Sequence, residues 1–220
     1  MLKSTLALIL FACCANAQIH PTVAATGQAS IFVPPDQAKI DITMTASGPN
    51  ASAASTKDAT QVTAVLGALT KLLGTGANIK TVNYFVGPVY NNSGSIITSY
   101  SASSTLEVTL TNLSLAGTVI DTAIGAGATS VGDVQFSLQN SDPAHNQALS
   151  AATLQAMAHA SAMATALGRM VGAVISVQEA GSTPTLGLLT GVTGAPSNTT
   201  TVVPGLLQVQ VSVNLQAELN

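Results

Sequence analysis

Residues 207–216, LQVQVSVNLQ, decide the fold class of this chain. Every second side chain in this stretch is apolar and the ones between are polar, which is the period of a strand with one buried face. The same alternation recurs at residues 39–44, 105–111 and 134–139. Strands of this kind are typical of antiparallel sheets that are covered on a single face.

Helices that cover this face are predicted at three stretches, in which apolar residues recur every three or four positions. They are residues 50–73, 114–127 and 142–167. The third is the best delimited, with Asp142 at the predicted N-cap and Gly168 just past the end. Its many alanines allow a close approach to a sheet. Larger apolar residues are spaced along it: Leu149, Met157, Met163 and Leu167.

The expected order is strand, strand, helix, strand, strand, helix, strand, helix, strand, a loop and a last strand. This order predicts an α+β fold, an antiparallel sheet layer covered on one face by amphipathic helices. We expect one domain over residues 18–220, with a long loop at about 181–205. Apolar side chains in this loop would be wetted in a monomer, which makes them candidate contacts with a second copy or a partner: Leu186, Leu188, Leu189 and Val192.

Residues 1–17 have the pattern of a cleaved secretory signal, with Lys3, an uncharged apolar run, and small residues before Gln18. The run is shorter than the roughly 20 residues of a membrane-spanning helix. Both cysteines, Cys13 and Cys14, lie inside this segment, so the processed chain would hold no thiol. Lipid attachment at one of these cysteines is the alternative to cleavage before Gln18. No later stretch is long and apolar enough for a transmembrane helix.

Charge is scarce in this chain: 7% of residues are charged, with six Lys and Arg against nine Asp and Glu. So few cations cannot neutralise a run of phosphates, which argues against nucleic acid as a partner. No phosphate-binding loop, nucleophile elbow or zinc helix is present, and we expect no catalytic residue, cofactor site or metal site. The helical histidines His145 and His159 are about 21 Å apart and cannot share a metal. A hydrolase whose site is gathered from distant residues stays open as an alternative.

The only aromatic concentration lies between the first and second predicted helices, and a hairpin turn is expected at residues 91–94. Ordinary strand packing around that hairpin is the favoured interpretation. The alternative is a surface for a glycan or peptide, which requires the tyrosine rings to lie exposed in one row. The aromatic residues of this segment are Tyr84, Phe85, Tyr90 and Tyr100, and the three tyrosines would form such a surface.

The order and spacing of several short segments resemble the SIMPL-domain family of secreted bacterial proteins. The segments are Thr26-Gly27, Pro35-Asp36-Gln37-Ala38, Ile79-Lys80-Thr81, Pro88-Val89-Tyr90, Tyr100-Ser101-Ala102, Gly117-Thr118-Val119-Ile120-Asp121, Leu167-Gly168 and Val203-Pro204-Gly205. The resemblance implies an α+β domain exported to the periplasm or outer envelope, sometimes assembled into large ring-like homo-oligomers and linked to stress tolerance. It offers no catalytic motif to carry over.

These observations predict a secreted, non-enzymatic protein of the cell envelope that acts by self-association or by binding an envelope protein. Low surface charge gives copies little mutual repulsion, and open strand edges offer surfaces for pairing. The alternatives are the glycan- or peptide-binding module and the envelope hydrolase.

Overall fold

The computed structural model describes residues 21–185 and 200–220. Strands and helices follow one another in the order that the hydrophobic periodicity predicts. The elements are β1 (Thr22–Val33), β2 (Gln37–Gly48), α1 (Ala51–Leu73), β3 (Asn78–Tyr90), β4 (Ile97–Leu110), a short 3-10 turn η1 (Leu113–Leu115), α2 (Ala116–Gly125), β5 (Ser130–Ser137), α3 (Asp142–Ala166), β6 (Val171–Thr185) and β7 (Leu207–Leu219).

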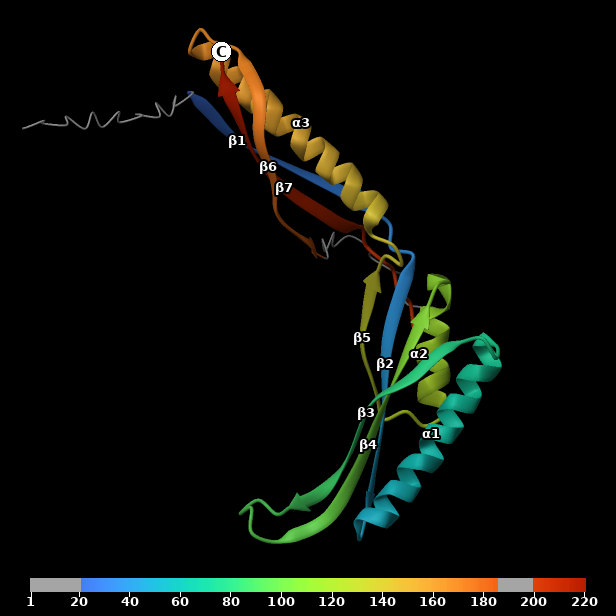
Figure 1. Ribbon diagram of the computed structural model, residues 1–220. Coiled ribbons are helices and arrows are strands. Elements are labelled where there is room, and N and C mark those ends of the chain that lie inside the picture. Colours follow the sequence, from blue (N-terminus) through green and yellow to red (C-terminus); the bar gives the residue numbers. More distant parts are fainter. Residues whose placement is uncertain (1–20, 186–199) are drawn as a thin grey trace, which may run out of the picture.

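The strands form two antiparallel sheets, which lie at opposite ends of an elongated molecule (Figure 1). The three-stranded lobe has the order β1-β7-β6 and is covered by α3; the four-stranded lobe has the order β3-β4-β2-β5 and is covered by α1 and α2. The predicted α+β fold with antiparallel sheet and covering helices is confirmed. The division of the strands between two sheets was not predicted, because alternation shows which face of a strand is buried but not which strand lies beside it.

The core of the four-stranded lobe is made by the alternating apolar residues of β2 and β4. Ile40, Ile42 and Met44 are fully buried and pack with residues of α1 and α2. The first helix starts where the sequence predicts, because the Asn50 side chain accepts a hydrogen bond of 2.8 Å from the Ala53 N–H group. In α3 the N-cap is Ser141, one residue before the predicted Asp142.

The three-stranded lobe is closed by alanines. Six alanines at intervals of four residues form the buried stripe of α3: Ala144, Ala148, Ala152, Ala156, Ala160 and Ala164. Strand β1 comes so close to this stripe that a Cβ atom on Gly27 would lie 2.0 Å from the Ala152 carbonyl oxygen. The larger apolar residues do not form the buried face: Leu149 and Met157 are half-buried on one flank, while Met163 and Leu167 are exposed. Only a side chain as small as alanine leaves room for this spacing between helix and strand.

Three passages of the chain join the two lobes. Asp36, before β2, is bonded to the segment after β5, since its Oδ1 atom accepts from the Gln139 N–H group at 2.7 Å. The third passage precedes β7, where Thr200 donates to Asp121 of α2 from its hydroxyl at 2.6 Å and from its N–H group at 3.2 Å. None of the helices in the described part of the chain is both long and apolar enough to cross a membrane.

Candidate interaction surface

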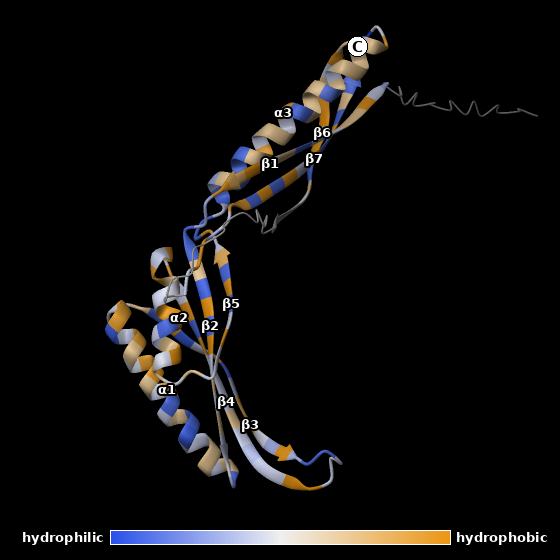
Figure 2. Ribbon diagram, turned by 180° about the vertical axis from the view of Figure 1, so that it is seen from behind, coloured by the Kyte–Doolittle hydropathy of each residue, from blue (hydrophilic) through white to orange (hydrophobic). Residues whose placement is uncertain are grey.

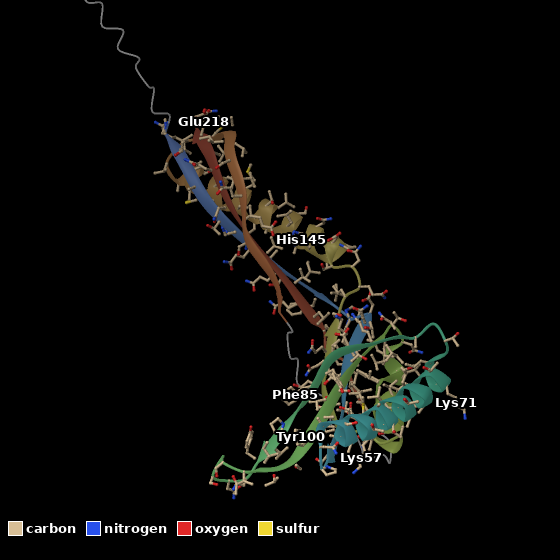
Figure 3. All side chains as sticks on the ribbon, turned by 60° about the horizontal axis from the view of Figure 1, so that its bottom comes forward. Lys57, Lys71, Phe85, Tyr100, His145 and Glu218 are labelled. Atoms are coloured by element: carbon tan, nitrogen blue, oxygen red, sulfur yellow. The ribbon has the colours of Figure 1, made fainter. Side chains whose placement is uncertain are left out.

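The β3–β4 hairpin forms an arm that curves away from α1 at the end of the four-stranded lobe (Figure 1). Large apolar side chains on this arm are exposed rather than packed, with Phe85 61% and Tyr90 52% accessible to solvent. We call the exposed set the arm patch: Tyr84, Phe85, Val89, Tyr90, Ile96 and Ile97. Figure 3 labels Phe85 and Tyr100 on this hairpin. Large apolar side chains that are exposed together on one hairpin are a feature of interaction sites.

The arm patch stays exposed because β3 is an edge strand and most of its side chains lie beyond the reach of the helices. On the outer face Phe85 folds over its own strand, and a Cβ on Gly87 would lie 2.6 Å from the Phe85 Cζ atom. An aromatic ring over a strand glycine covers backbone that would otherwise be wetted. Residues 81–106 contain no Asp, Glu, Lys, Arg or His. The whole arm is therefore apolar or neutral, as the centre of a protein interface usually is.

The tip of the arm is a hydrogen-bonded turn. Asn91 accepts hydrogen bonds from the Ser95 and Ile96 N–H groups at 3.1 and 3.2 Å, and Gly94 has a positive φ of 71°. A glycine meets this φ value without steric cost. The Gly94 N–H group also donates to the Asn91 carbonyl oxygen at 2.9 Å, so the predicted turn at residues 91–94 is confirmed.

The predicted packing of the aromatic cluster is wrong for three of its four members, since Tyr84, Phe85 and Tyr90 are exposed and only Tyr100 is half-buried. The Tyr84 hydroxyl donates to Ser55 Oγ of α1 at 3.2 Å. Strand pairing places Tyr84 opposite Ser104 and Phe85 opposite Ser103, so the two rings lie on opposite faces of the sheet. Because Tyr100 is half-buried, the three tyrosine rings do not lie exposed in one row.

The histidines are placed apart, each with its own partner. His159 Nδ1 donates to the Thr26 carbonyl oxygen of β1 at 2.8 Å. His145 Nε2 lies 3.5 Å from Glu179 Oε2 of β6, with both side chains about one-third exposed. Each imidazole thus connects α3 to a strand of the three-stranded lobe. Within the described ranges, no three residues among His, Cys, Asp and Glu are grouped closely enough to hold a metal ion.

A buried carboxyl group on α1 was not singled out by the sequence. Asp58 is 1% exposed and accepts a hydrogen bond from the Ser104 hydroxyl of β4, which is also buried. Its Oδ1 atom has no hydrogen-bond partner among the described residues. The sequence does place Asp58 on the buried face of the helix, because it lies four residues before Val62 of the apolar stripe. Buried between helix and sheet, this pair fixes how α1 sits on β4.

Glu107 lies on the outer face of the four-stranded sheet between two cations, with its Oε1 atom 3.0 Å from Lys80 Nζ and its Oε2 atom 3.6 Å from Lys39 Nζ. The hydrogen bond from Lys80 is the main cause that lowers the pKa of Glu107 below its ordinary value. Desolvation acts in the opposite direction, and the charge of Lys39 lowers the pKa further. The three side chains come from three neighbouring strands, so the pairs tie β3, β4 and β2 together.

We expect Lys80→Gln to move the pKa of Glu107 back towards its ordinary value, as measured by NMR titration of the carboxyl carbon. Because the folded pKa is lowered, the ion pairs stabilise the fold fully above the ordinary pKa, and this contribution disappears as the pH falls through the lowered pKa. Lys80→Gln should therefore flatten the acid limb of the melting temperature against pH. Lys71→Gln, at the end of α1, is the matched control, and an equal effect of both variants would contradict the assignment.

The predicted contact residues Leu186, Leu188, Leu189 and Val192 lie outside the described residues. The aromatic residues of the arm patch were considered only as the alternative, a glycan- or peptide-binding surface, because their residue types are also those of buried strands. That these side chains are exposed can be recognised only once it is known that β3 is an edge strand.

This chain is similar to known proteins over most of its length. The chain is 26% identical to the 26 kDa periplasmic immunogenic protein of Brucella melitensis biotype 1 over 210 residues, which cover 90% of this chain and 84% of that protein. The protein of the same name from Brucella abortus (strain S19) shows the same identity and coverage. The sequence profile of the SIMPL family, described as proteins of unknown function (DUF541), matches residues 23–217, from the first strand to the last. The chain therefore belongs to the SIMPL family.

Proposed function

We propose that this chain is an exported, non-enzymatic protein of the cell envelope that works by self-association through the arm patch. The observation that carries the proposal is the arm itself, a hairpin whose large apolar side chains are exposed in a segment without charge. Burial of such side chains against another protein surface releases about 25 cal/mol for each Å² of apolar area.

Export is supported by the pattern of residues 1–17 and by the relatives, whose name places them in the periplasm. A second copy is favoured as the partner because 7% charged residues leave little repulsion between copies. The loop residues Leu186, Leu188, Leu189 and Val192 are proposed as a further contact. A role in stress tolerance belongs to the proposal on the strength of the family resemblance alone.

Analytical ultracentrifugation of the exported protein at micromolar concentration tests this proposal, after its mass has been checked against a chain beginning at Gln18. We expect an assembly larger than one chain. The double variant Phe85→Ser/Tyr90→Ser should weaken it by at least about tenfold in dissociation constant, as removal of central aromatic residues does at protein interfaces. Both side chains are exposed, so the fold should be kept.

Leu154→Ser is the matched control, because Leu154 is 69% exposed on α3 and lies in the other lobe. It should leave the assembly unchanged. A wild-type protein that still sediments as a monomer well above micromolar concentration would overturn the proposal. So would a Leu154→Ser protein whose assembly is weakened as much as that of the double variant.

A further inference from the structure

Every second residue of β1 presents its backbone N–H and C=O groups to the outer edge of the three-stranded sheet. Immediately before β1, the Pro21 carbonyl oxygen accepts a hydrogen bond of 2.8 Å from the Leu219 N–H group of β7. Backbone groups of alternate residues in an antiparallel pair point to opposite edges, so the even-numbered residues of β1 point away from β7. This edge would accept an added strand if no other part of the chain covered it.

Two side chains of α3 cover the middle of this edge. Gln155 Oε1 accepts from the Gln28 N–H group at 2.5 Å, and His159 Nδ1 donates to the Thr26 carbonyl oxygen at 2.8 Å. An added strand would offer the same two groups, a carbonyl oxygen to Gln28 and an N–H group to Thr26. The two α3 side chains therefore occupy the backbone positions that a fourth strand would need.

The spacing of the two side chains fits because α3 lies along β1 (Figure 2). Four residues of a helix rise about 6 Å, and two residues of a strand span about 7 Å. The close contact at Gly27, where a Cβ atom would lie 2.0 Å from the Ala152 carbonyl oxygen, keeps the helix near enough for both side chains to reach the edge. One turn before and one turn after the pair, the same flank of α3 carries Ala151 and Met163, which can form neither bond. Polar side chains thus lie on this flank where the middle of β1 has to be covered.

We infer that Gln155 and His159 are edge guards, which keep the three-stranded sheet from adding an extended segment of another chain along β1. The inference goes beyond the proposed self-association and does not depend on it. Extended segments recognise an open edge through its backbone groups, so an unguarded β1 would pair with many sequences. The guards remove this promiscuous binding because they satisfy the two backbone groups from within the same chain.

The test measures whether an extended peptide binds once the guards are removed. The probe is a fluorescein-labelled peptide with the sequence of residues 22–33, and its binding is followed by fluorescence anisotropy. We expect Gln155→Ala/His159→Ala to bind the probe at least about tenfold more tightly than the wild type, because two hydrogen-bonding groups of the edge become free. The matched control is Asn146→Ala/Gln147→Ala, since both side chains are exposed on α3 and neither is hydrogen-bonded to β1 in the described part of the chain. The control should bind the probe as weakly as the wild type does.

A second pair of variants separates the hydrogen bond from simple coverage of the edge. Gln155→Glu keeps an acceptor for the Gln28 N–H group and should leave the edge closed, whereas Gln155→Lys supplies only donors and should open it. Hydrogen exchange followed by NMR should show the Gln28 amide protected in the wild type and in Gln155→Glu. In Gln155→Lys this amide should exchange at least about tenfold faster.

Circular dichroism and melting temperature close to the wild-type values confirm that each variant is folded. A folded double variant that binds the probe no better than the wild type would overturn the inference, and so would a wild type that already binds it as tightly. If the double variant does not fold, the comparison of Gln155→Glu with Gln155→Lys decides, and equal exchange of the Gln28 amide in these two variants would overturn the inference.

Discussion

Replacing Gly27 with alanine is expected to destabilise the protein by about 3 kcal/mol, the upper part of the usual range for overpacking a tight interface. The added Cβ would lie 2.0 Å from the Ala152 carbonyl oxygen and 2.5 Å from the Ala156 nitrogen. Both are backbone atoms in the middle of α3, so neither can turn aside as a side chain would. The whole helix has to move away from β1, which opens the alanine interface along its length.

The measurement is the melting temperature by circular dichroism, which should fall by roughly 6–12 °C for a protein of this size. Gly67→Ala is the matched control, because a Cβ on Gly67 of α1 meets nothing within 4 Å. Alanine is a better helix former than glycine by roughly 1 kcal/mol, so the control should melt above the wild type. A Gly27→Ala protein that melts at or above the wild-type temperature would refute the close approach of β1 to α3.

Replacing Ile42 with alanine is expected to cost about 2–5 kcal/mol, the usual range for truncating a fully buried isoleucine. Ile42 lies in the middle of β2 between Leu106 of β4 and Val131 of β5, and it is 0% exposed. The lost methylene and methyl groups leave a cavity, because neighbours from two strands and the covering helices cannot all shift to fill it.

Urea unfolding measures this cost, with Ile124→Ala as the matched control. Ile124 is 55% exposed on α2, so its truncation should change the free energy of unfolding by less than about 0.5 kcal/mol. Both substitutions belong in the Phe85→Ser/Tyr90→Ser background, so that the dissociation expected from the proposed self-association is not measured together with unfolding. Equal costs for the buried and the exposed isoleucine would contradict the core of the four-stranded lobe.

Much of the fold was readable from the sequence. The period of two in residues 207–216 predicted β7, and the alanine-rich segment with Gly168 at its end predicted a helix close to a sheet. What periodicity does not supply is the partner of each strand. Pairing of β1 with β7 joins the two ends of the described chain, and no local pattern encodes a contact across that separation.

The candidate surface was harder to predict than the fold. The types of Phe85 and Val177 are those of a core strand, and exposure follows only from their place on edges that the helices leave uncovered. His159 and Gln155 look like ordinary helix-surface residues in sequence, yet they cover the edge of β1. A surface defined by which strand ends a sheet depends on the tertiary arrangement.

The placement of β7 at the centre of the three-stranded sheet has a consequence for biogenesis. Residues 37–137, which form the other sheet, are contiguous, so their strands can pair before the rest of the chain has been synthesised. Strands β1 and β6 have to wait for the final segment before either gains its neighbour. During that interval both strands would be vulnerable to misassembly.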